Sequence, residues 1–297
     1  ARRGYRIRVA VRRPDLAGFL QPIGGVGQIS FVQATLRYRQ SVDRAVEGSD
    51  HVINCVGILF ESGRNNFDAV QDFGARAVAE ATRAIGAKLT HISAIGADEK
   101  SGSSYARTKA RGEAAVLRTV PDAVILRPSI VFGPEDGFFN KFATMARYAP
   151  VLPLIGGGHT KFQPVYVADV AEAVARSVDG TIERGRVYEL GGPEVLTFRQ
   201  CLELMLRIVD RKNLLISLPF GIASLMGSVA SLVPFIKPPL TSDQVTLLRA
   251  DNIVSDTARN EGRTLEAIGI EPILAEAILP SYLVRYRQQG QFTRIDK

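Results

Sequence analysis

Short apolar runs alternate with longer amphipathic stretches along the first half of the chain. The short runs have the length of buried strands, and the stretches between them carry apolar residues at the three- and four-residue spacing of helices. Strands are expected at residues 6–11, 28–32, 51–56, 89–93 and 123–126, and helices at 42–47, 66–85 and 104–119. Strands that alternate with helices predict a parallel sheet, which places ligand-binding groups at the carboxyl ends of its strands.

After Phe132-Gly133-Pro134 the pattern changes. Prolines and glycines become frequent, and the remaining apolar periodicity is mainly helical. Helices are expected at 170–178, 198–209, 242–249 and 274–286, with a strand at 187–190. We therefore predict an α/β fold with a Rossmann-type, doubly wound parallel sheet over residues 1–134. A smaller, mainly helical C-terminal lobe is predicted over residues 135–297, interleaved with the first domain and suited to docking or substrate binding.

The composition is that of a soluble globular protein, since 46% of the 297 residues are hydrophobic and 23% are charged. Cys55 and Cys201 stand far apart and lack metal-ligand spacing, which is typical of a reducing compartment and not of a disulfide framework. His51, His91 and His159 are isolated from one another, so no metal site is predicted.

The net charge of +7 is concentrated at the N-terminal end. Residues 1–44 hold nine arginines and two aspartates, while acidic and basic side chains cancel over the remainder. Such an edge is either simply solvated or meets phosphate, anionic lipid or an acidic partner. Nucleic acid is not predicted as a partner, because no aromatic residues or recognition motif are interleaved with the arginines.

The strongest chemical pattern joins Ser93, Tyr105 and Lys109. Ser93 ends an expected strand, and Tyr105 and Lys109 lie four residues apart on one face of an expected helix. A nearby ammonium favours the phenolate and lowers the tyrosine pKa toward neutrality, so that the tyrosine can exchange a proton with a substrate oxygen. The serine orients that oxygen, and the lysine also reaches a nicotinamide ribose. The same side chains suit nucleotide binding without chemistry, and a lone Tyr–Lys pair is common on helix surfaces.

Asn54, Val56 and Gly57 stand at the end of the expected strand 51–56. A strand that ends in Asn and then Gly lets the backbone approach a ligand closely, because glycine has no side chain. These residues are therefore candidate cofactor contacts, and an ordinary strand-to-loop turn is the alternative.

Another candidate loop runs from Arg127 to Pro134, directly after a strand. Proline ends sheet pairing, so the run is in one interpretation a simple strand exit. It also resembles the loop beside the nicotinamide in extended short-chain dehydrogenases, and this resemblance implies cofactor contacts through Pro128 and Ile130.

Arg12 and Arg13 end the first expected strand, where a dinucleotide fold holds the adenosine ribose. Arginine there accommodates the 2′-phosphate of NADP, whereas an acid binds the 2′-hydroxyl of NAD. The nearest acid is Asp15, so NADPH or NADP is predicted, with a solvated strand end as the alternative. The glycines at 24, 25 and 27 precede a strand and are expected to form a turn. The first strand and the phosphate-binding glycine loop are therefore expected upstream of this sequence.

Longer segments resemble one atypical family of short-chain dehydrogenase/reductases. Residues 123–136, 138–143, 163–170 and 239–245 are similar to the nucleotide-binding accessory subunit of respiratory complex I (NADH:ubiquinone oxidoreductase). The resemblance implies tightly held NADP(H), no turnover of its own, and a structural role at the junction of the peripheral and membrane arms. It implies other complex I subunits as partners, among them membrane-arm and quinone-site subunits. The implied location is peripheral on the inner membrane, on the mitochondrial matrix face or the bacterial cytoplasmic face.

Residues 214–236 form a run of 23 without charge, flanked by Arg211, Lys212 and Lys237. The run is long enough to span a bilayer, but its prolines and glycines argue against an autonomous spanning helix. Burial in the smaller lobe is one alternative. Docking of an apolar surface on a membrane subunit or on lipid is the other, and a role in complex I favours it.

Three functions stay open at this point. A non-catalytic complex I subunit predicts co-purification with a membrane complex and slowly exchanging nucleotide. An active NAD(P)-dependent reductase, dehydrogenase or epimerase predicts turnover that is lost in Tyr105→Phe. A redox-sensing regulator predicts a free protein whose affinity for a partner depends on the state of the nucleotide.

Overall fold

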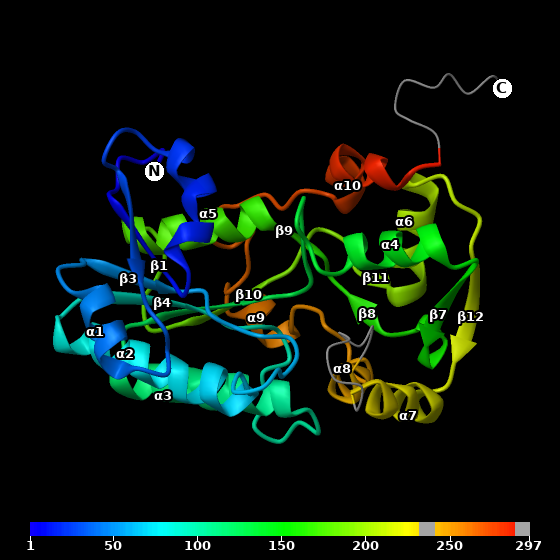
Figure 1. The fold of residues 1–297 in the computed structure, drawn as a ribbon, viewed down its shortest axis with the longest axis horizontal. Coiled ribbons are helices and arrows are strands. Elements are labelled where there is room, and N and C mark those ends of the chain that lie inside the picture. The colour runs from blue at the N-terminus through cyan, green and yellow to red at the C-terminus, as the bar shows by residue number, and fades with distance from the viewer. Residues whose placement is uncertain (232–240, 289–297) are drawn as a thin grey trace. The chain divides into compact units, whose positions relative to one another are not determined.

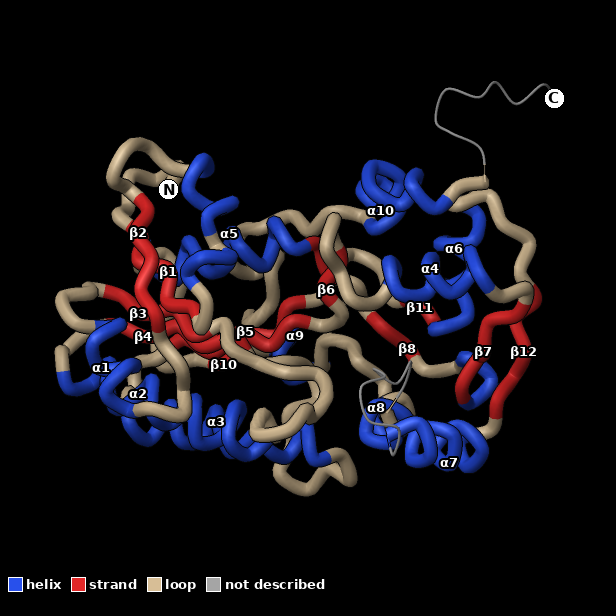
Figure 2. The backbone as a smooth tube through the Cα atoms, in the orientation of Figure 1, coloured by secondary structure: helices blue, strands red, loops and turns tan. Residues whose placement is uncertain are grey.

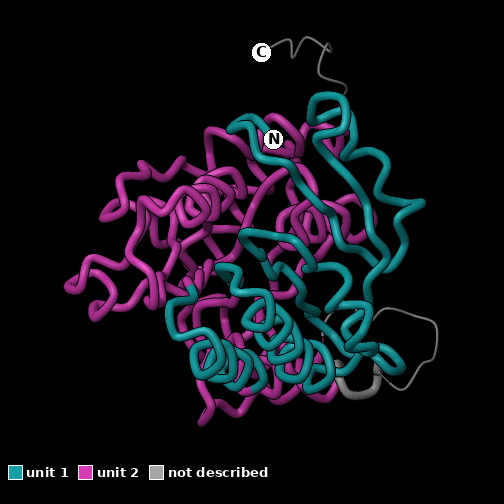
Figure 3. The backbone as a smooth tube through the Cα atoms, turned by 90° about the vertical axis from the view of Figure 1, so that its left-hand side faces the viewer, with its two compact units in different colours: residues 1–91, 108–123 teal, residues 92–107, 124–297 magenta. Residues whose placement is uncertain are grey.

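The computed structural model describes residues 1–231 and 241–288. It has the expected α/β architecture, in which parallel strands alternate with helices along the chain (Figures 1 and 2). By its backbone contacts the chain divides into two compact units (Figure 3). Unit 1 comprises residues 1–91 and 108–123, and unit 2 comprises residues 92–107 and 124–297. The lobe boundary at residue 134 was expected from a change in the sequence pattern, whereas these units are defined by backbone contacts. The units do not test that boundary, which stays a prediction.

Unit 1 contains two pairs of parallel strands. The first pair is β1 (Ile7–Val11) with β2 (Ile29–Gln33), and the second is β3 (His51–Asn54) with β4 (Lys88–Ile92). Each of these four strands begins within two residues of its expected start. Short runs rich in β-branched residues favour strands, which is why the pattern located them. In the second pair Asn54 lies opposite His91, so both strands direct their carboxyl ends to the same edge.

The helices of unit 1 follow the expected segments. The first are α1 (Arg39–Val46) and α2 (Gly74–Ala84), the latter preceded by a π-helical stretch at Asp68–Phe73. The second half of α3 (Ser104–Thr119) also belongs to this unit. A Cβ atom on Gly112 of α3 would lie 2.2 Å from the carbonyl oxygen of Gln71. Glycine at this position therefore allows the two helical segments to pack with their backbones in close approach.

Unit 2 contains the strand pair that continues the predicted βαβ pattern. β5 (Val124–Pro128) pairs in parallel with β10 (Val187–Leu190), and α5 (Val167–Asp179) precedes β10 in the chain. The residues that follow β4 also run beside β5, since the Ser93 amide donates to the Leu126 carbonyl at 2.7 Å. Leu126 and Leu190 are fully buried, which places these strands in the core of the unit.

A second core in unit 2 combines aliphatic side chains with a group of packed aromatic rings. It lies between α4 (Phe139–Tyr148), α6 (Phe198–Ile208) and α10 (Ala275–Leu283). The ring centroid of Phe138 lies 5.2 Å from that of Phe142 and 6.0 Å from that of Phe198, in edge-to-face geometry. Short elements border this core: β6 (Val131–Phe132) with β9 (Val165–Tyr166), β8 (Lys161–Phe162) with β11 (Leu196–Thr197), and α8 (Ser242–Leu247). Helix α9 (Asp256–Asn260) contributes Ala258 to a separate small cluster with Ile95 and Val254.

The uncharged stretch begins with a strand and a helix that the periodicity does not predict. β12 (Leu214–Leu218) pairs in parallel with β7 (Val151–Ile155), and α7 (Phe220–Ser231) follows directly. The rest of the stretch, residues 232–236, lies outside the described residues, as do residues 237–240. Among the helices that the structure describes, none combines the length and the hydropathy that crossing a bilayer requires.

Burial in the lobe is also the wrong interpretation for much of this stretch. The side chains of Leu214, Ile216, Ile222, Leu225 and Met226 are each more than half exposed. A run of apolar residues does not itself say which side chains face a core, because that depends on what the strand and helix pack against.

Candidate functional site

Helix α3 carries two of the three residues of the expected triad. Tyr105 lies in its first turn and Lys109 lies one turn later, so both project from one helical face. Ser93 follows β4 directly, as expected for a residue at the carboxyl end of a strand. The elements predicted to carry the triad are therefore present, and the joint geometry of the three side chains stays a prediction.

The Lys109 side chain is held beside the loop that follows β3. It is only 5% exposed, and a Cβ atom on Gly57 would lie 3.3 Å from its Nζ atom. Burial lowers the pKa of Lys109 to about 8, while Glu113 and Cys55 act in the opposite direction. A glycine backbone beside a buried ammonium fits the close approach of a ribose or phosphate oxygen, which is the contact that this loop was predicted to make.

Asn54 holds this loop in place instead of pointing freely at a ligand. Its Oδ1 atom accepts from the Val56 amide at 3.1 Å, which leaves its Nδ2 atom to donate to Nδ1 of His91, also at 3.1 Å. The proton of the neutral His91 ring is then on Nε2, which has no hydrogen-bond partner in the described part of the chain. The pKa of His91 is lowered to about 3, first by burial and then by Lys109.

Ser93 is placed as a buried hydroxyl at the end of β4. The residue is 4% exposed, and its Oγ atom has no hydrogen-bond partner within residues 1–231 and 241–288. An unpaired buried hydroxyl lowers stability by roughly 1–3 kcal/mol, so a ligand oxygen that paired with it would recover that loss. The orphaned oxygen therefore fits a hydrogen bond with a bound ligand.

The expected lowering of the Tyr105 pKa is wrong. The pKa of Tyr105 is raised to about 12, first because the phenol is buried and then because the negative charge of Asp243 disfavours the phenolate. The sequence argument considered only the lysine on the same helix. It missed a carboxylate that comes from a part of the chain about 140 residues away.

Asp243 lies in the first turn of α8 and caps the start of α3. Its carboxylate accepts from the Ser103 hydroxyl at 2.8 Å and from the Ser104 amide at 2.7 Å. The one local signal was the capping box formed by Thr241 and Gln244, which places an acid in the first turn of α8. That signal says nothing about α3.

The similarity to known proteins agrees with this arrangement. Residues 1–191 match the NAD dependent epimerase/dehydratase family. The chain is also 32% identical over 301 residues, 98% of its length and 74% of the relative's, to NADH dehydrogenase (ubiquinone) 1 alpha subcomplex subunit 9, mitochondrial, of Arabidopsis thaliana. The chain belongs to the subunit 9 family of complex I, within the epimerase/dehydratase family. The resemblance found in the sequence is thereby confirmed.

Two further proteins are similar to this subunit 9 chain, one in its structure and one in its sequence. The structure of Citrobacter sp. triphenylmethane reductase complexed with NADP(H) superposes with a TM-score of 0.71 at 15% identity, and the match covers 93% of this chain and 90% of that one. This likeness confirms the Rossmann-type fold. Ceramide reductase of Caulobacter vibrioides is 33% identical over 171 residues, 58% of this chain and 52% of the relative.

Two expected cofactor contacts of this subunit 9 chain lie in and just after β5. Pro128 is buried, and its carbonyl accepts from the Ile95 amide at 3.0 Å. Ile130 packs against the aromatic core of unit 2, and its carbonyl accepts from the Val165 amide. Both residues therefore have structural roles at this strand end, and their contact with a cofactor stays a prediction.

In this subunit 9 chain Arg12 and Arg13 follow the carboxyl end of β1, the position expected from the sequence, and their contact with a nucleotide stays a prediction. Both are exposed, and Arg13 forms a surface ion pair with Asp15 at 2.8 Å. An exposed ion pair of this kind contributes little to stability. Exchanging Asp15 for a phosphate as the partner of Arg13 would therefore cost little free energy. The glycines at 24–27 form a turn before β2, as expected, with Gly27 at φ +71°.

Proposed function

We propose that this chain binds NADP(H) as a non-catalytic subunit of respiratory complex I. The observation that carries the proposal is the 32% identity to alpha subcomplex subunit 9 over 98% of the chain. The bound nucleotide would supply a hydride donor or acceptor. In the proposal Lys109 and Tyr105 bind its ribose, and Ser93 donates or accepts a hydrogen bond nearby. Arg12 and Arg13 hold the 2′-phosphate, which favours NADP(H) over NAD(H).

The lack of turnover is supported by the state of two triad residues. With its pKa raised to about 12, the Tyr105 phenol gives up its proton less readily than an ordinary tyrosine, although it still donates a hydrogen bond. The Ser93 hydroxyl is buried and unpaired in the described part of the chain, which suits a permanently bound ligand better than a substrate that exchanges with solvent. An intact set of catalytic side chains is therefore compatible with a purely binding role.

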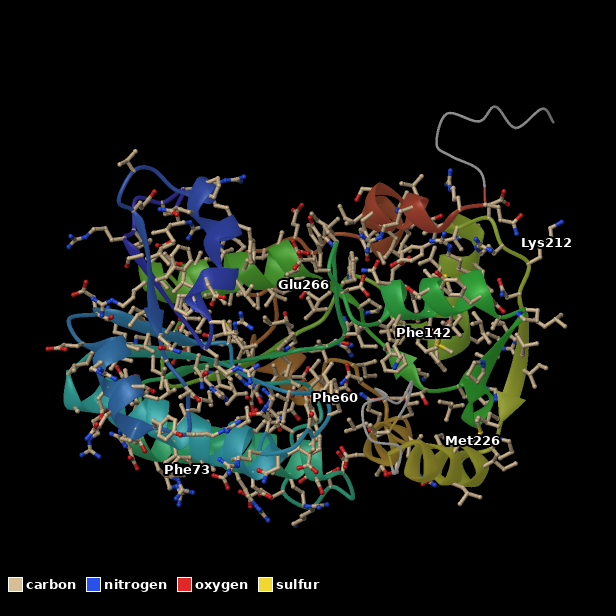
Figure 4. The ribbon with its side chains drawn as sticks, in the orientation of Figure 1. Phe60, Phe73, Phe142, Lys212, Met226 and Glu266 are labelled. Atoms are coloured by element: carbon tan, nitrogen blue, oxygen red, sulfur yellow. The ribbon has the colours of Figure 1, made fainter. Side chains whose placement is uncertain are left out.

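A membrane-facing role is supported by unit 2. Apolar side chains of β12 and α7 are exposed, and so are the cations Lys212 and Arg249. Lys212 lies just before β12, at the other end of that strand from Met226 of α7 (Figure 4), and the Arg249 guanidinium lies over the Phe220 ring at the start of α7, 4.8 Å from its centroid. Apolar groups beside cations suit an anionic lipid surface or an apolar subunit surface. In the proposal residues 214–236 dock against lipid, while membrane-arm and quinone-site subunits cover neighbouring surfaces. The protein is then peripheral on the inner membrane, on the matrix face of a mitochondrion or the cytoplasmic face of a bacterium.

The deciding experiment uses the native protein, extracted from membranes in mild detergent. Proteins that migrate with it are identified, and the nucleotide released on denaturation is identified and counted by mass. We expect co-migration with NADH:quinone oxidoreductase activity and about one NADP(H) per chain. Lys109→Met serves as the control, since it should enter the complex while holding less nucleotide. A free soluble protein with readily exchanging nucleotide would refute the proposal.

An active reductase is the second candidate. The complete Ser93, Tyr105 and Lys109 set favours it, as does the 33% identity to ceramide reductase over 171 residues. The two functions are separated by assaying the protein with NADPH and oxidised ceramide-type substrates. Turnover that disappears in Tyr105→Phe would support the reductase, and no turnover above the Tyr105→Phe background would support the binding role.

A further inference from the structure

The His91 ring ends a chain of hydrogen bonds that starts at the backbone after β3. The Val56 amide donates to Oδ1 of Asn54, and Nδ2 of Asn54 donates to Nδ1 of His91, both at 3.1 Å. Because a backbone amide can only donate, it identifies the oxygen of the Asn54 side chain and leaves the amide nitrogen to face His91. The Nδ1 atom must then accept, so the proton of the neutral ring is on Nε2.

The Nε2–H group at the end of this chain is a buried donor. His91 is 2% exposed, and its Nε2 atom has no hydrogen-bond partner within residues 1–231 and 241–288. A buried N–H group without a partner lowers stability by roughly 1–3 kcal/mol, and most buried polar groups of proteins are paired. Asn54 nevertheless holds the ring in the one tautomer that creates this donor. The arrangement therefore indicates an acceptor that arrives with a ligand.

The groups around the donor indicate which ligand oxygen it suits. The Nζ atom of Lys109 lies 3.3 Å from where a Cβ atom on Gly57 would be, so the ammonium borders the loop that Asn54 holds. Its charge also contributes to the lowered pKa of His91, which places the ring within its electrostatic range. The His91 donor is neutral, and Glu113 partly compensates the ammonium. Donors of this kind suit a neutral hydroxyl oxygen better than a doubly charged phosphate.

We propose that His91 is a further ligand-binding residue of the nucleotide site, whose Nε2–H group donates to a ribose hydroxyl that Lys109 also contacts. Asn54, expected from the sequence to contact the cofactor directly, is then a positioning residue, because it touches His91 and not the ligand. The proposal rests on the proposed function, since it needs a nucleotide bound beside Lys109. All of these residues belong to unit 1, so strand β4 and the second half of α3 each supply one donor to the same sugar.

Two substitutions divide the two nitrogens of the His91 ring. His91→Gln places an amide N–H close to the position of Nε2, so it keeps the donor and gives up the contact with Asn54. His91→Asn places its amide close to the position of Nδ1, so it keeps that contact and loses the donor. His51→Asn is the matched control, because His51 lies at the other end of β3 from Asn54 and pairs through Nε2 with Oγ1 of Thr90 at 2.7 Å.

The full-length protein, depleted of nucleotide, is titrated with NADPH. In His91→Asn we expect the Kd to rise about tenfold, as loss of one buried hydrogen bond predicts, whereas His91→Gln should stay within about threefold of the wild type. His51→Asn should bind as the wild type does. If the ring only holds the loop through Asn54, the order of the two His91 variants is reversed, and that result would overturn the proposal.

The ring proton itself is observed by NMR. The chain has only three histidines, so its imidazole spectrum is simple, and the His91 signals are those missing from His91→Gln. In the nucleotide-free protein we expect a ring protonated at Nε2. Added NADPH should move this proton downfield and slow its exchange with water, since it becomes hydrogen-bonded. A signal that NADPH leaves in place means that the donor pairs with water at most, and it would remove His91 from the site.

Failure of this contact and failure of the proposed function give different results. A complex I subunit that carries NADP(H) but shows an unmoved His91 signal would keep the proposed function and lose the contact. A free, soluble protein in which NADPH does move the signal would keep the contact and lose the role in complex I.

Discussion

Replacing Lys109 by methionine should stabilise the nucleotide-free protein. Methionine has a similar length and no charge, so it removes the unfavourable burial of an ammonium without leaving a large cavity. Lys109 is 5% exposed, and its pKa falls from 10.5 to about 8, mainly because of burial. A buried charge that weakens the fold is expected where the charge serves a ligand.

The size of the effect follows from the shifted pKa of Lys109. A difference of one pH unit corresponds to about 1.4 kcal/mol, so a pKa that falls from 10.5 to about 8 lowers the stability at neutral pH by about 3 kcal/mol. The folded state releases the proton near pH 8 and the unfolded state only near pH 10.5. The penalty is therefore complete below about pH 8 and falls to about 1 kcal/mol by pH 10.

The assay is urea unfolding of wild-type and Lys109→Met protein at about pH 7 and about pH 10. The variant should be more stable at the lower pH, and the difference between the two proteins should shrink by roughly 2 kcal/mol at the higher pH. Lys88→Met, in which an exposed lysine of β4 is replaced, corrects for the general loss of one positive charge. Added NADPH should stabilise the wild type and Lys88→Met but not Lys109→Met.

A difference that is the same at both pH values would refute the argument, because the penalty would then not come from burying the charge. Stabilisation of Lys109→Met by NADPH to the same extent as the wild type would separately remove Lys109 from the nucleotide site.

Three further outcomes are expected. Gly112→Ala should lower the free energy of unfolding by roughly 1–3 kcal/mol in a urea titration, because the new Cβ meets the Gln71 carbonyl at 2.2 Å; an unchanged midpoint would contradict this packing. Tyr282→Phe should cost roughly 1.5–3 kcal/mol in the same assay, because it removes the 2.6 Å hydrogen bond from the Tyr282 hydroxyl to the Asp136 carboxylate. His91, whose pKa is lowered to about 3, should show no NMR titration between about pH 5 and 8. Below about pH 6.5 only the ring of the unfolded state takes up a proton, so His91 should lower the free energy of unfolding as the pH falls further. A His91 ring that titrates near pH 6 in the folded protein would refute its burial.

The apolar pattern predicted the strands and helices of the first half because these elements are decided locally. The runs at 28–32 and 51–56 became β2 and β3, and the stretch at 104–119 became α3 with the predicted bounds. Periodicity follows from the geometry of strand and helix, so any segment with the right spacing exposes one face to be buried. The family was also predictable, since long segments such as 123–136 carry it.

The C-terminal half was less predictable because its elements depend on distant partners. The pairing of β12 with β7 joins residues about 60 apart, and nothing within 214–218 distinguishes a strand of that kind from the start of a helix. Which of its apolar side chains stay exposed is decided by what lies on either face, and the sequence does not give that information.

The candidate site divides in the same way. Residue identity and spacing determined that Tyr105 and Lys109 share a helical face and that Gly57 follows a strand. The pKa values of the two side chains were decided only by the tertiary structure, which buries Lys109 and brings Asp243 to the start of α3. A pKa depends on solvent and on charges within a few ångströms. Sequence separation does not limit those distances, so the folded chain alone decides whether these residues bind or react.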